Sequence, residues 1–175
     1  MLRPSHRGVS LIEAMVALVI MSMLLVAGAP SFSQFMQNRK VRNSAEAITN
    51  GLSLAKTEAV SRNTNVTFTL TADSGWTVGC TVATEPTCPA SIHTRSGLEG
   101  SGGTAVAATA VTFNGFGRMP AGSADTTINV TNPLGTCEKD GGSMRCLRVV
   151  VSTAGRVRSC DPQLTTTNPT SPQAC

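Results

Sequence analysis

The sequence is poor in aromatic side chains, with no tyrosine, one tryptophan and five phenylalanines among 175 residues. Beyond residue 62 four aromatic residues remain, and most of them are expected in a core: Phe68, Trp76, Phe113 and Phe116. Proteins that hold single-stranded nucleic acid use several exposed aromatic rings on which bases stack. The scarcity of such rings argues against a stacking platform of that kind.

Histidine is also scarce, since the sequence has His6 and His93 and no others. No nucleophile–base constellation is evident, and no glycine-rich loop stands between a strand and a helix as phosphate binding requires. None of the six cysteines forms a C-x-x-C pair, and their spacing does not suit zinc. The sequence therefore predicts no enzyme, no catalytic residue, no metal site and no cofactor.

Charge is nearly missing from Val9 to Ala29, where 21 residues include one charged side chain, Glu13. A helix of this length spans a bilayer core of ~30 Å at ~1.5 Å per residue. Arg3 and Arg7 precede it and favour a cytoplasmic N-terminus. A secretory signal is the alternative, but an A-x-A-like cleavage site is missing. A carboxylate inside a membrane helix is costly, so Glu13 is expected to be functional.

Gly8 and the residues that follow it, through Glu13, resemble the class III signal of type IV pilins and pseudopilins. The resemblance implies that a prepilin peptidase cuts between Gly8 and Val9 and methylates the new N-terminus. It also implies that Glu13 pairs with the N-terminal amine of a neighbouring pilin subunit during assembly. Pro30 matches the family's helix-kinking proline, whereas Val9 replaces the commoner Phe or Met. A signal anchor with an unrelated glutamate is the alternative.

A long helix is predicted from about Val9 to Arg62, and Pro30 is expected to kink or interrupt it because proline removes one backbone donor. An apolar stripe follows at alternating steps of four and three residues: Val41, Ala45, Ile48, Leu52, Ala55 and Ala59. The expected organisation is a leader at 1–8, a transmembrane half at 9–29, an amphipathic half at 30–62 and a β-rich globular domain at 63–175.

Short strands are predicted in the globular domain, where Thr, Val, Gly and Ser dominate and turn residues separate the runs: Val66–Thr71, Trp76–Val82, Ala110–Phe113, Thr126–Thr131, Leu147–Ser152 and Arg156–Cys160. Strands that follow one long helix indicate an α+β, type IV pilin-like fold, with an antiparallel sheet packed on the helix. Ser96–Ala110 is expected to be a mobile loop, and Thr165–Ala174 to be disordered unless Cys175 holds it.

All the cysteines lie beyond the apolar segment: Cys80, Cys88, Cys137, Cys146, Cys160 and Cys175. An even number of cysteines in an exported domain indicates disulfides, formed in the periplasm or on a surface fibre. Pairing between sequence neighbours would join 80 to 88, 137 to 146 and 160 to 175. A bond between Cys146 and Cys160, which flank the last two predicted strands, is the rival.

Two further stretches carry a narrower resemblance. Val111-Thr112-Phe113-Asn114 is followed by Gly117-Arg118, and the strand before Ser152 is followed by Gly155-Arg156-Val157-Arg158. Together with the N-terminal signal, they resemble the GspH/FimT family of minor pilins and pseudopilins. FimT-like members with the second motif are implicated in DNA binding during natural transformation. FimU-like members are structural minor pilins, and GspH-like members belong to type II secretion pseudopili.

The net charge of +4 lies in the N-terminal part, because residues 63–175 hold seven basic and seven acidic side chains. Within this neutral domain, residues 145–160 contain no acidic side chain and four arginines: Arg145, Arg148, Arg156 and Arg158. Residues 152–155 fit a tight turn in which Gly155 is free to take positive φ.

Alternation along the last strand would place Arg156 and Arg158 on one face, about 6.6 Å apart, with Val157 turned inward. Arg148 would join them from the partner strand. Guanidinium groups bind phosphate through paired donors, so this surface suits the backbone of double-stranded DNA, with weak, salt-sensitive and sequence-independent affinity. Lys139 and Arg118 are weaker candidates.

The alternative for these arginines is a solvated strand face, or ion pairs with Glu138, Asp140 and Asp161. The function predicted first is a minor pilin that binds DNA during uptake. A structural minor pilin or pseudopilin that primes assembly is the other possibility. In both cases the chain is expected in the inner membrane, crossing it once with the domain in the periplasm, and then in a fibre with other pilin subunits.

Overall fold

The structure, a computed structural model, describes residues 9–175. Gly8, on one side of the predicted cleavage site, lies outside the described residues. The chain falls into two units, residues 1–35 and residues 36–175. Helix α1 (Leu11–Arg62) contributes to both and continues through position 30, so a proline there does not interrupt it.

In the first unit, α1 carries an apolar surface that no other described part of the chain covers. Its large apolar side chains from Val9 to Val26 are all more than half exposed, with values of 53% to 77%. Water does not favour so continuous an apolar surface. This segment is long and apolar enough to cross a membrane as a helix.

In the second unit, α1 buries the predicted stripe completely. Its six members are 0% exposed: Val41, Ala45, Ile48, Leu52, Ala55 and Ala59. The periodicity of the sequence therefore identified the packed face correctly. The three alanines have short side chains, which let the strands approach the helix backbone closely.

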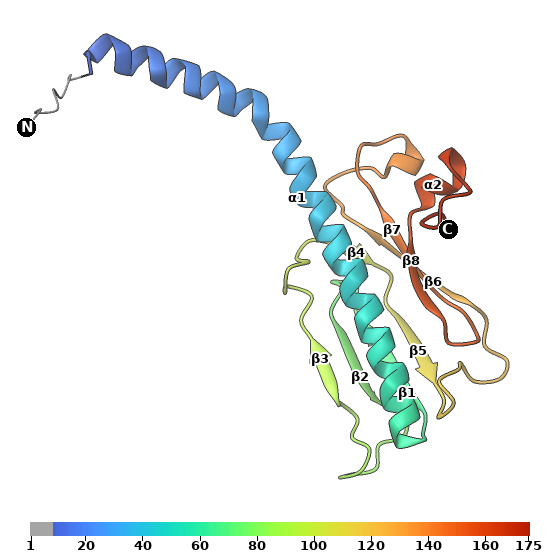
Figure 1. Ribbon diagram of the computed structural model, residues 1–175. Coiled ribbons are helices and arrows are strands. Elements are labelled where there is room, and N and C mark those ends of the chain that lie inside the picture. The colour runs from blue at the N-terminus through green and yellow to red at the C-terminus, as the bar shows by residue number, and fades with distance from the viewer. Residues whose placement is uncertain (1–8) are drawn as a thin grey trace, which may run out of the picture. The chain divides into compact units, whose positions relative to one another are not determined.

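Two four-stranded antiparallel sheets pack on this part of the helix (Figure 1). One has the order β3-β2-β1-β5, and its strands are β1 (Val66–Leu70), β2 (Trp76–Cys80), β3 (His93–Arg95) and β5 (Thr109–Phe113). The other has the order β4-β6-β7-β8, and its strands are β4 (Ala105–Val106), β6 (Thr126–Thr131), β7 (Leu147–Val151) and β8 (Val157–Cys160). The α+β, pilin-like fold is confirmed, with two sheets where one was expected.

Side-chain alternation directs one face of each sheet to the helix. In β1, Val66, Phe68 and Leu70 are buried, and the threonines between them are not. In β7, Val149 and Val151 are both 0% exposed. The two sheets and the helical stripe therefore share one core.

Several short elements of the structure were not predicted from the sequence. β3 and β4 have three and two residues, and β3 lacks apolar alternation. β4 lies inside the segment 96–110 that was expected to be a mobile loop. Helix α2 (Pro162–Thr167) begins after Asp161, whose carboxylate accepts a hydrogen bond from Gln163 N at 2.9 Å. A 3₁₀ turn, η1, covers Glu138–Asp140.

The six cysteines form the three pairs between sequence neighbours: Cys80–Cys88, Cys137–Cys146 and Cys160–Cys175. The rival bond between Cys146 and Cys160 is not formed. Each disulfide closes a segment that lies outside the regular strands. The last one ties down the C-terminal segment, as its threonine- and proline-rich composition required.

The end of α1 is fixed by Glu58, whose side chain is 18% exposed. Its carboxylate lies 2.8 Å from Arg62 Nε and 3.4 Å from His93 Nε2 on β3. Arg62 also donates to the carbonyl oxygen of Thr87. The hydrogen bond from Arg62 lowers the pKa of Glu58 below its ordinary value of 4.5, and His93 adds to this effect. These contacts link the helix end to the segment between β2 and β3.

Glu58→Gln is expected to lower the free energy of unfolding at neutral pH by about 1 kcal/mol, because glutamine cannot accept charge-assisted hydrogen bonds. The pKa of Glu58 is lowered by folding, so this stabilisation is present above pH 4.5 and is lost as the pH falls through the lowered pKa. Denaturant unfolding of the oxidised full-length protein in detergent, at several pH values, measures it. Glu46→Gln is the control, since Glu46 pairs with Arg42 at a site where the two side chains are 60% and 75% exposed. Equal effects of the two substitutions at neutral pH would contradict this account.

Candidate nucleic-acid interface

The turn between β7 and β8 is a tight one that its own hydrogen bonds define. Ser152 N donates to Arg156 O at 2.9 Å, and Gly155 N donates to Ser152 O at 2.8 Å. The hydroxyl of Ser152 accepts a further bond from Arg156 N at 3.1 Å. Gly155 has φ of 78°, so the predicted need for positive φ is met. We refer to residues 152–155 as the hairpin turn.

The hairpin turn is held against two other parts of the chain. Lys56 Nζ, from α1, donates to Gly155 O at 2.9 Å. A Cβ atom added to Gly155 would stand 1.9 Å from the carbonyl oxygen of Gly117. Met119 N donates to Thr153 O at 3.1 Å. The turn is therefore a rigid part of the surface.

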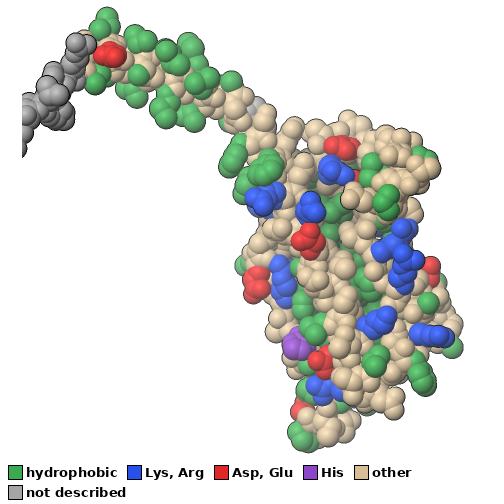
Figure 2. Space-filling view, viewed as in Figure 1, with side chains coloured by type: hydrophobic (Ala, Val, Ile, Leu, Met, Phe, Trp, Pro, Cys, Tyr) green, Lys and Arg blue, Asp and Glu red, His purple; other side chains and the backbone are tan. Residues whose placement is uncertain are grey.

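The structure places Arg148 and Arg158 together, on the face of the sheet that points away from the core. Val150 pairs with Arg158 and Arg148 with Cys160, whereas the buried Val149 and Val151 alternate with them. Val157 faces the core, as predicted. Arg156 stands just before β8 and is exposed. In Figure 2, Lys and Arg side chains gather on the side of the molecule that carries β7 and β8.

The hydrogen bonds of these arginines differ, and this separates their possible roles. The side chain of Arg156 makes no hydrogen bond or ion pair with any residue from 9 to 175. Arg158 is half-buried and donates to Ala174 O at 3.4 Å and Cys175 O at 2.9 Å. Arg148 Nε donates to Asn129 Oδ1 at 2.9 Å. Arg148 and Arg156 therefore have no carboxylate partner among residues 9–175, whereas backbone oxygens of the last two residues of the sequence hold Arg158.

Arg145, the fourth predicted arginine, has a carboxylate partner. Its guanidinium lies 2.6 Å from Asp161 Oδ2, and the Asp161 side chain is 4% exposed. A buried carboxylate needs such compensation. Lys139, a weaker candidate, pairs with Asp140 at 2.7 Å. The structure therefore groups three of the four arginines and assigns Arg145 to an internal ion pair.

A second turn lies beside the hairpin turn; the sequence analysis named Arg118 as a weaker candidate but did not predict this turn as part of the site. Residues 114–118 form it, and it presents Arg118 and Phe116 to solvent. A cleft of about 590 Å³ lies here, lined by Asn114, Phe116, Arg118, Met119, Ala121 and Thr153. The Asn-Gly-Phe-Gly-Arg order of residues 114–118, typical of a glycine-containing turn, was the available signal, but nothing in the sequence showed which side the turn faces.

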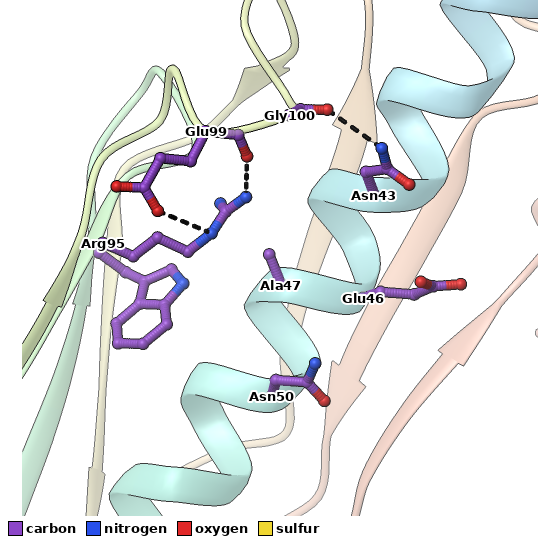
Figure 3. A pocket seen from close by; sticks show the side chains of 8 residues that line it. Asn43, Glu46, Ala47, Asn50, Arg95, Glu99 and Gly100 are labelled. Carbon is purple, nitrogen blue, oxygen red and sulfur yellow. Dashed lines mark hydrogen bonds and ion pairs between the residues drawn. The ribbon is translucent and has the colours of Figure 1, made fainter.

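Another hollow, of about 350 Å³, lies between α1 and the segment after β3 (Figure 3). Some of its polar groups bind one another. Arg95 contacts both the carbonyl oxygen and the carboxylate of Glu99, and Asn43 Nδ2 donates to Gly100 O at 3.2 Å. These bonds fasten the loop to the helix. Among residues 9–175, no group of three or more His, Cys, Asp or Glu side chains is placed to hold a metal ion.

Comparison with known protein families found two matches in this chain. Residues 3–29 match the prokaryotic N-terminal methylation motif. Residues 44–155 match the family described as Type II transport protein GspH, and this range covers more than half of the chain. The chain belongs to the GspH family. It is a pilin or pseudopilin, with a structural and not an enzymatic role.

Membership in the GspH family explains the exposed apolar half of α1. The methylation motif marks a prepilin, which a prepilin peptidase processes and which assembles with other pilins. The hydrophobic helix holds the protein in the inner membrane before it enters a pilus or pseudopilus.

Solved structures of similar fold include the type IV minor pilin FimU of Pseudomonas aeruginosa in two crystal forms. One is 20% identical and covers 71% of this chain and 90% of its own, with a TM-score of 0.53. The other is 21% identical and covers 70% of this chain and 97% of its own, with a TM-score of 0.51. At this identity the likeness concerns the fold. A comparison with curated protein sequences found no match.

Gly155→Ala is expected to lower the free energy of unfolding by about 3 kcal/mol, the sum of a positive-φ penalty and a steric clash. Gly122→Ala is the matched control, because Gly122 also has positive φ, 84°, but has no atom within 4 Å of an added Cβ. This control is expected to cost about 1 kcal/mol. Denaturant unfolding of the two variants measures the difference. Equal decreases in the free energy of unfolding for the two variants would contradict the close contact between the hairpin turn and Gly117.

Proposed function

We propose that this chain is a minor pilin of a type IV pilus that binds DNA during natural transformation, through the hairpin of Gly155 to Arg158. The observation that carries the proposal is the state of Arg156. Its guanidinium is exposed, stands beside a rigid turn and has no acceptor in the described part of the chain. A free guanidinium in a fixed place suits a phosphate group, which accepts two of its hydrogen bonds.

Arg148 and Arg158 support the same role by their charge. Both lie on the outward face, with Arg158 two residues from Arg156 and Arg148 farther along β7, and the acceptor of Arg148 is the neutral amide oxygen of Asn129. Their bonds hold the guanidinium groups in place, so little side-chain entropy is lost when a phosphate approaches. Arg145 is left out of the proposed phosphate contacts because Asp161 compensates its charge.

The proposed partner is double-stranded DNA, recognised by its backbone. Two or three phosphate contacts give weak binding that falls as salt rises and does not depend on sequence. Repetition along a fibre would raise the effective affinity of such a weak site.

Arg156→Ala is expected to weaken duplex binding by about tenfold at low salt and to reduce the salt dependence by about one counterion. Titration of the oxidised full-length protein in detergent with duplex DNA, at low and at physiological salt, measures both. Arg42→Ala is the charge-matched control, since Arg42 is exposed on α1 and pairs with Glu46. If Arg156→Ala bound duplex DNA with unchanged affinity at equal thermal stability, the hairpin would be excluded as part of the DNA-binding site.

In the cell, the same variant separates the two candidate functions. Loss of transformation with normal piliation supports DNA uptake. Loss of fibres or of secretion supports a structural subunit that primes a pilus or a type II secretion pseudopilus. That second candidate is favoured by the bonds of Arg145, Arg148 and Arg158 inside the chain, which stabilise the C-terminal segment and the sheet.

Both candidates require assembly, which we propose to depend on Glu13. In this proposal the leader 1–8 is removed between Gly8 and Val9, residues 9–29 span the membrane and 30–62 carry the domain of 63–175. Glu13 lies in the first turn of α1, among exposed apolar side chains. A carboxylate there is costly in lipid unless it meets a positive charge, and the N-terminal amine of a neighbouring subunit supplies one.

Glu13→Ala is expected to leave membrane insertion intact and to reduce the amount of this subunit in sheared fibres by at least about tenfold, the loss of one charge pair in an apolar surrounding. Immunoblots of membrane and fibre fractions measure the two quantities. Glu46→Ala, on the same helix but in the second unit, is the control and should enter fibres normally. Recovery of Glu13→Ala in fibres at the normal level would refute the role of Glu13.

A further inference from the structure

Phe116 differs from the other aromatic residues of the second unit. Phe68 and Phe113 are 0% exposed and Trp76 is 9% exposed, whereas Phe116 is 85% exposed. Single exposed apolar residues are common on protein surfaces, so exposure alone decides nothing. The role that we infer for Phe116 depends on the residues that surround it.

The turn of residues 114–118 holds the Phe116 backbone firmly. Asn114 Oδ1 accepts hydrogen bonds from Phe116 N at 3.0 Å and from Arg118 N at 3.2 Å. Asn114 N donates to Arg118 O, and Gly117 N donates to Asn114 O, both at 2.8 Å. Gly117 has φ of 71°, which suits glycine. The ring is therefore presented from a fixed backbone.

This turn also belongs to the same rigid surface as the proposed phosphate site. Gly155 lies directly against the carbonyl of Gly117, and Thr153 O accepts a hydrogen bond from Met119 N. Phe116, Arg118 and Thr153 line one cleft of about 590 Å³. That volume is sufficient for a ligand of the size of a nucleotide.

Charge around the cleft is predominantly positive. Arg118 and Arg156 are exposed, and neither side chain has a partner among residues 9–175. Lys56 adds a third cation at the carbonyl oxygen of Gly155. Asp125 is the acid at this place, and its carboxylate accepts a hydrogen bond from Thr153 N at 2.8 Å. Three cations against one carboxylate favour an anionic ligand.

A ligand that matches both features has a flat apolar ring and a phosphate on either side of it. We propose that Phe116 stacks on an unpaired DNA base while Arg118 and Arg156 hold the flanking phosphates, so that this surface binds duplex DNA by its phosphates and binds unpaired stretches of the DNA more tightly. In a duplex the base faces are hidden between neighbouring pairs, whereas a single strand offers them. The inference rests on the proposed DNA-binding function and adds Phe116 to it. Duplex would be bound by its phosphates alone, without the stacking contribution.

The experiment uses the oxidised full-length protein in detergent and two probes of equal phosphate number, an oligothymidylate and a fully paired, blunt-ended duplex. Phe116→Leu is expected to weaken oligothymidylate binding about tenfold and to leave duplex binding unchanged, because stacking of one base is lost. Phe116→Trp should retain the preference for the single strand. Leucine at an 85% exposed position leaves the core untouched, and thermal unfolding checks this.

Three outcomes would overturn the inference, and they are distinguishable. If Phe116→Leu binds both probes as the parent does, while Arg156→Ala weakens both, the DNA-binding function stands and the stacking role is wrong. If the parent binds neither probe at low salt, the proposed function fails and the inference fails with it. If Phe116→Leu lowers the amount of subunit in sheared fibres with unchanged DNA affinities, Phe116 is a contact for another pilin subunit.

Discussion

The buried stripe of α1 is the surface on which the second unit depends, because both sheets bury their inner faces against it. Among residues 9–175, neither sheet has another helix to cover it: α2 has six residues, and none of them is buried. The inner side chains, such as Phe68 and Val149, are fully removed from water. Burial of this kind is the main favourable term in folding. The helix thus serves as the common core element of the domain, in addition to its apolar membrane-spanning half.

The elements that follow from simple periodicity were predictable. The stripe of α1 repeats at helical spacing, and β1 and β7 alternate or run apolar, so their residues could be assigned from sequence. β3 and β4 could not, because three exposed residues and two residues carry no pattern. They exist because backbone groups of Trp76 and Val130 on neighbouring strands are available for pairing.

The candidate site was predictable in composition and not in detail. The four arginines and the positive φ of Gly155 were visible in the sequence. Which arginine is free was not, since that depends on partners far along the chain: Asp161 for Arg145, and Ala174 and Cys175 for Arg158. Most of the four aromatic residues were expected in the core, and Phe116 is the exception, because the Asn114 turn presents it to solvent.

The C-terminal segment has a consequence for how copies of this protein can meet. β8 is the last strand of its sheet, and such a strand offers unpaired backbone groups to any extended chain. Here Asp161 N donates to Gln173 O at 2.7 Å, and the bond between Cys160 and Cys175 keeps that segment in place. The segment thus acts as a guard against strand addition at this end of β8. Strand pairing between copies of the protein is therefore blocked at this end of β8. The apolar half of α1 remains the surface through which copies in a membrane can associate.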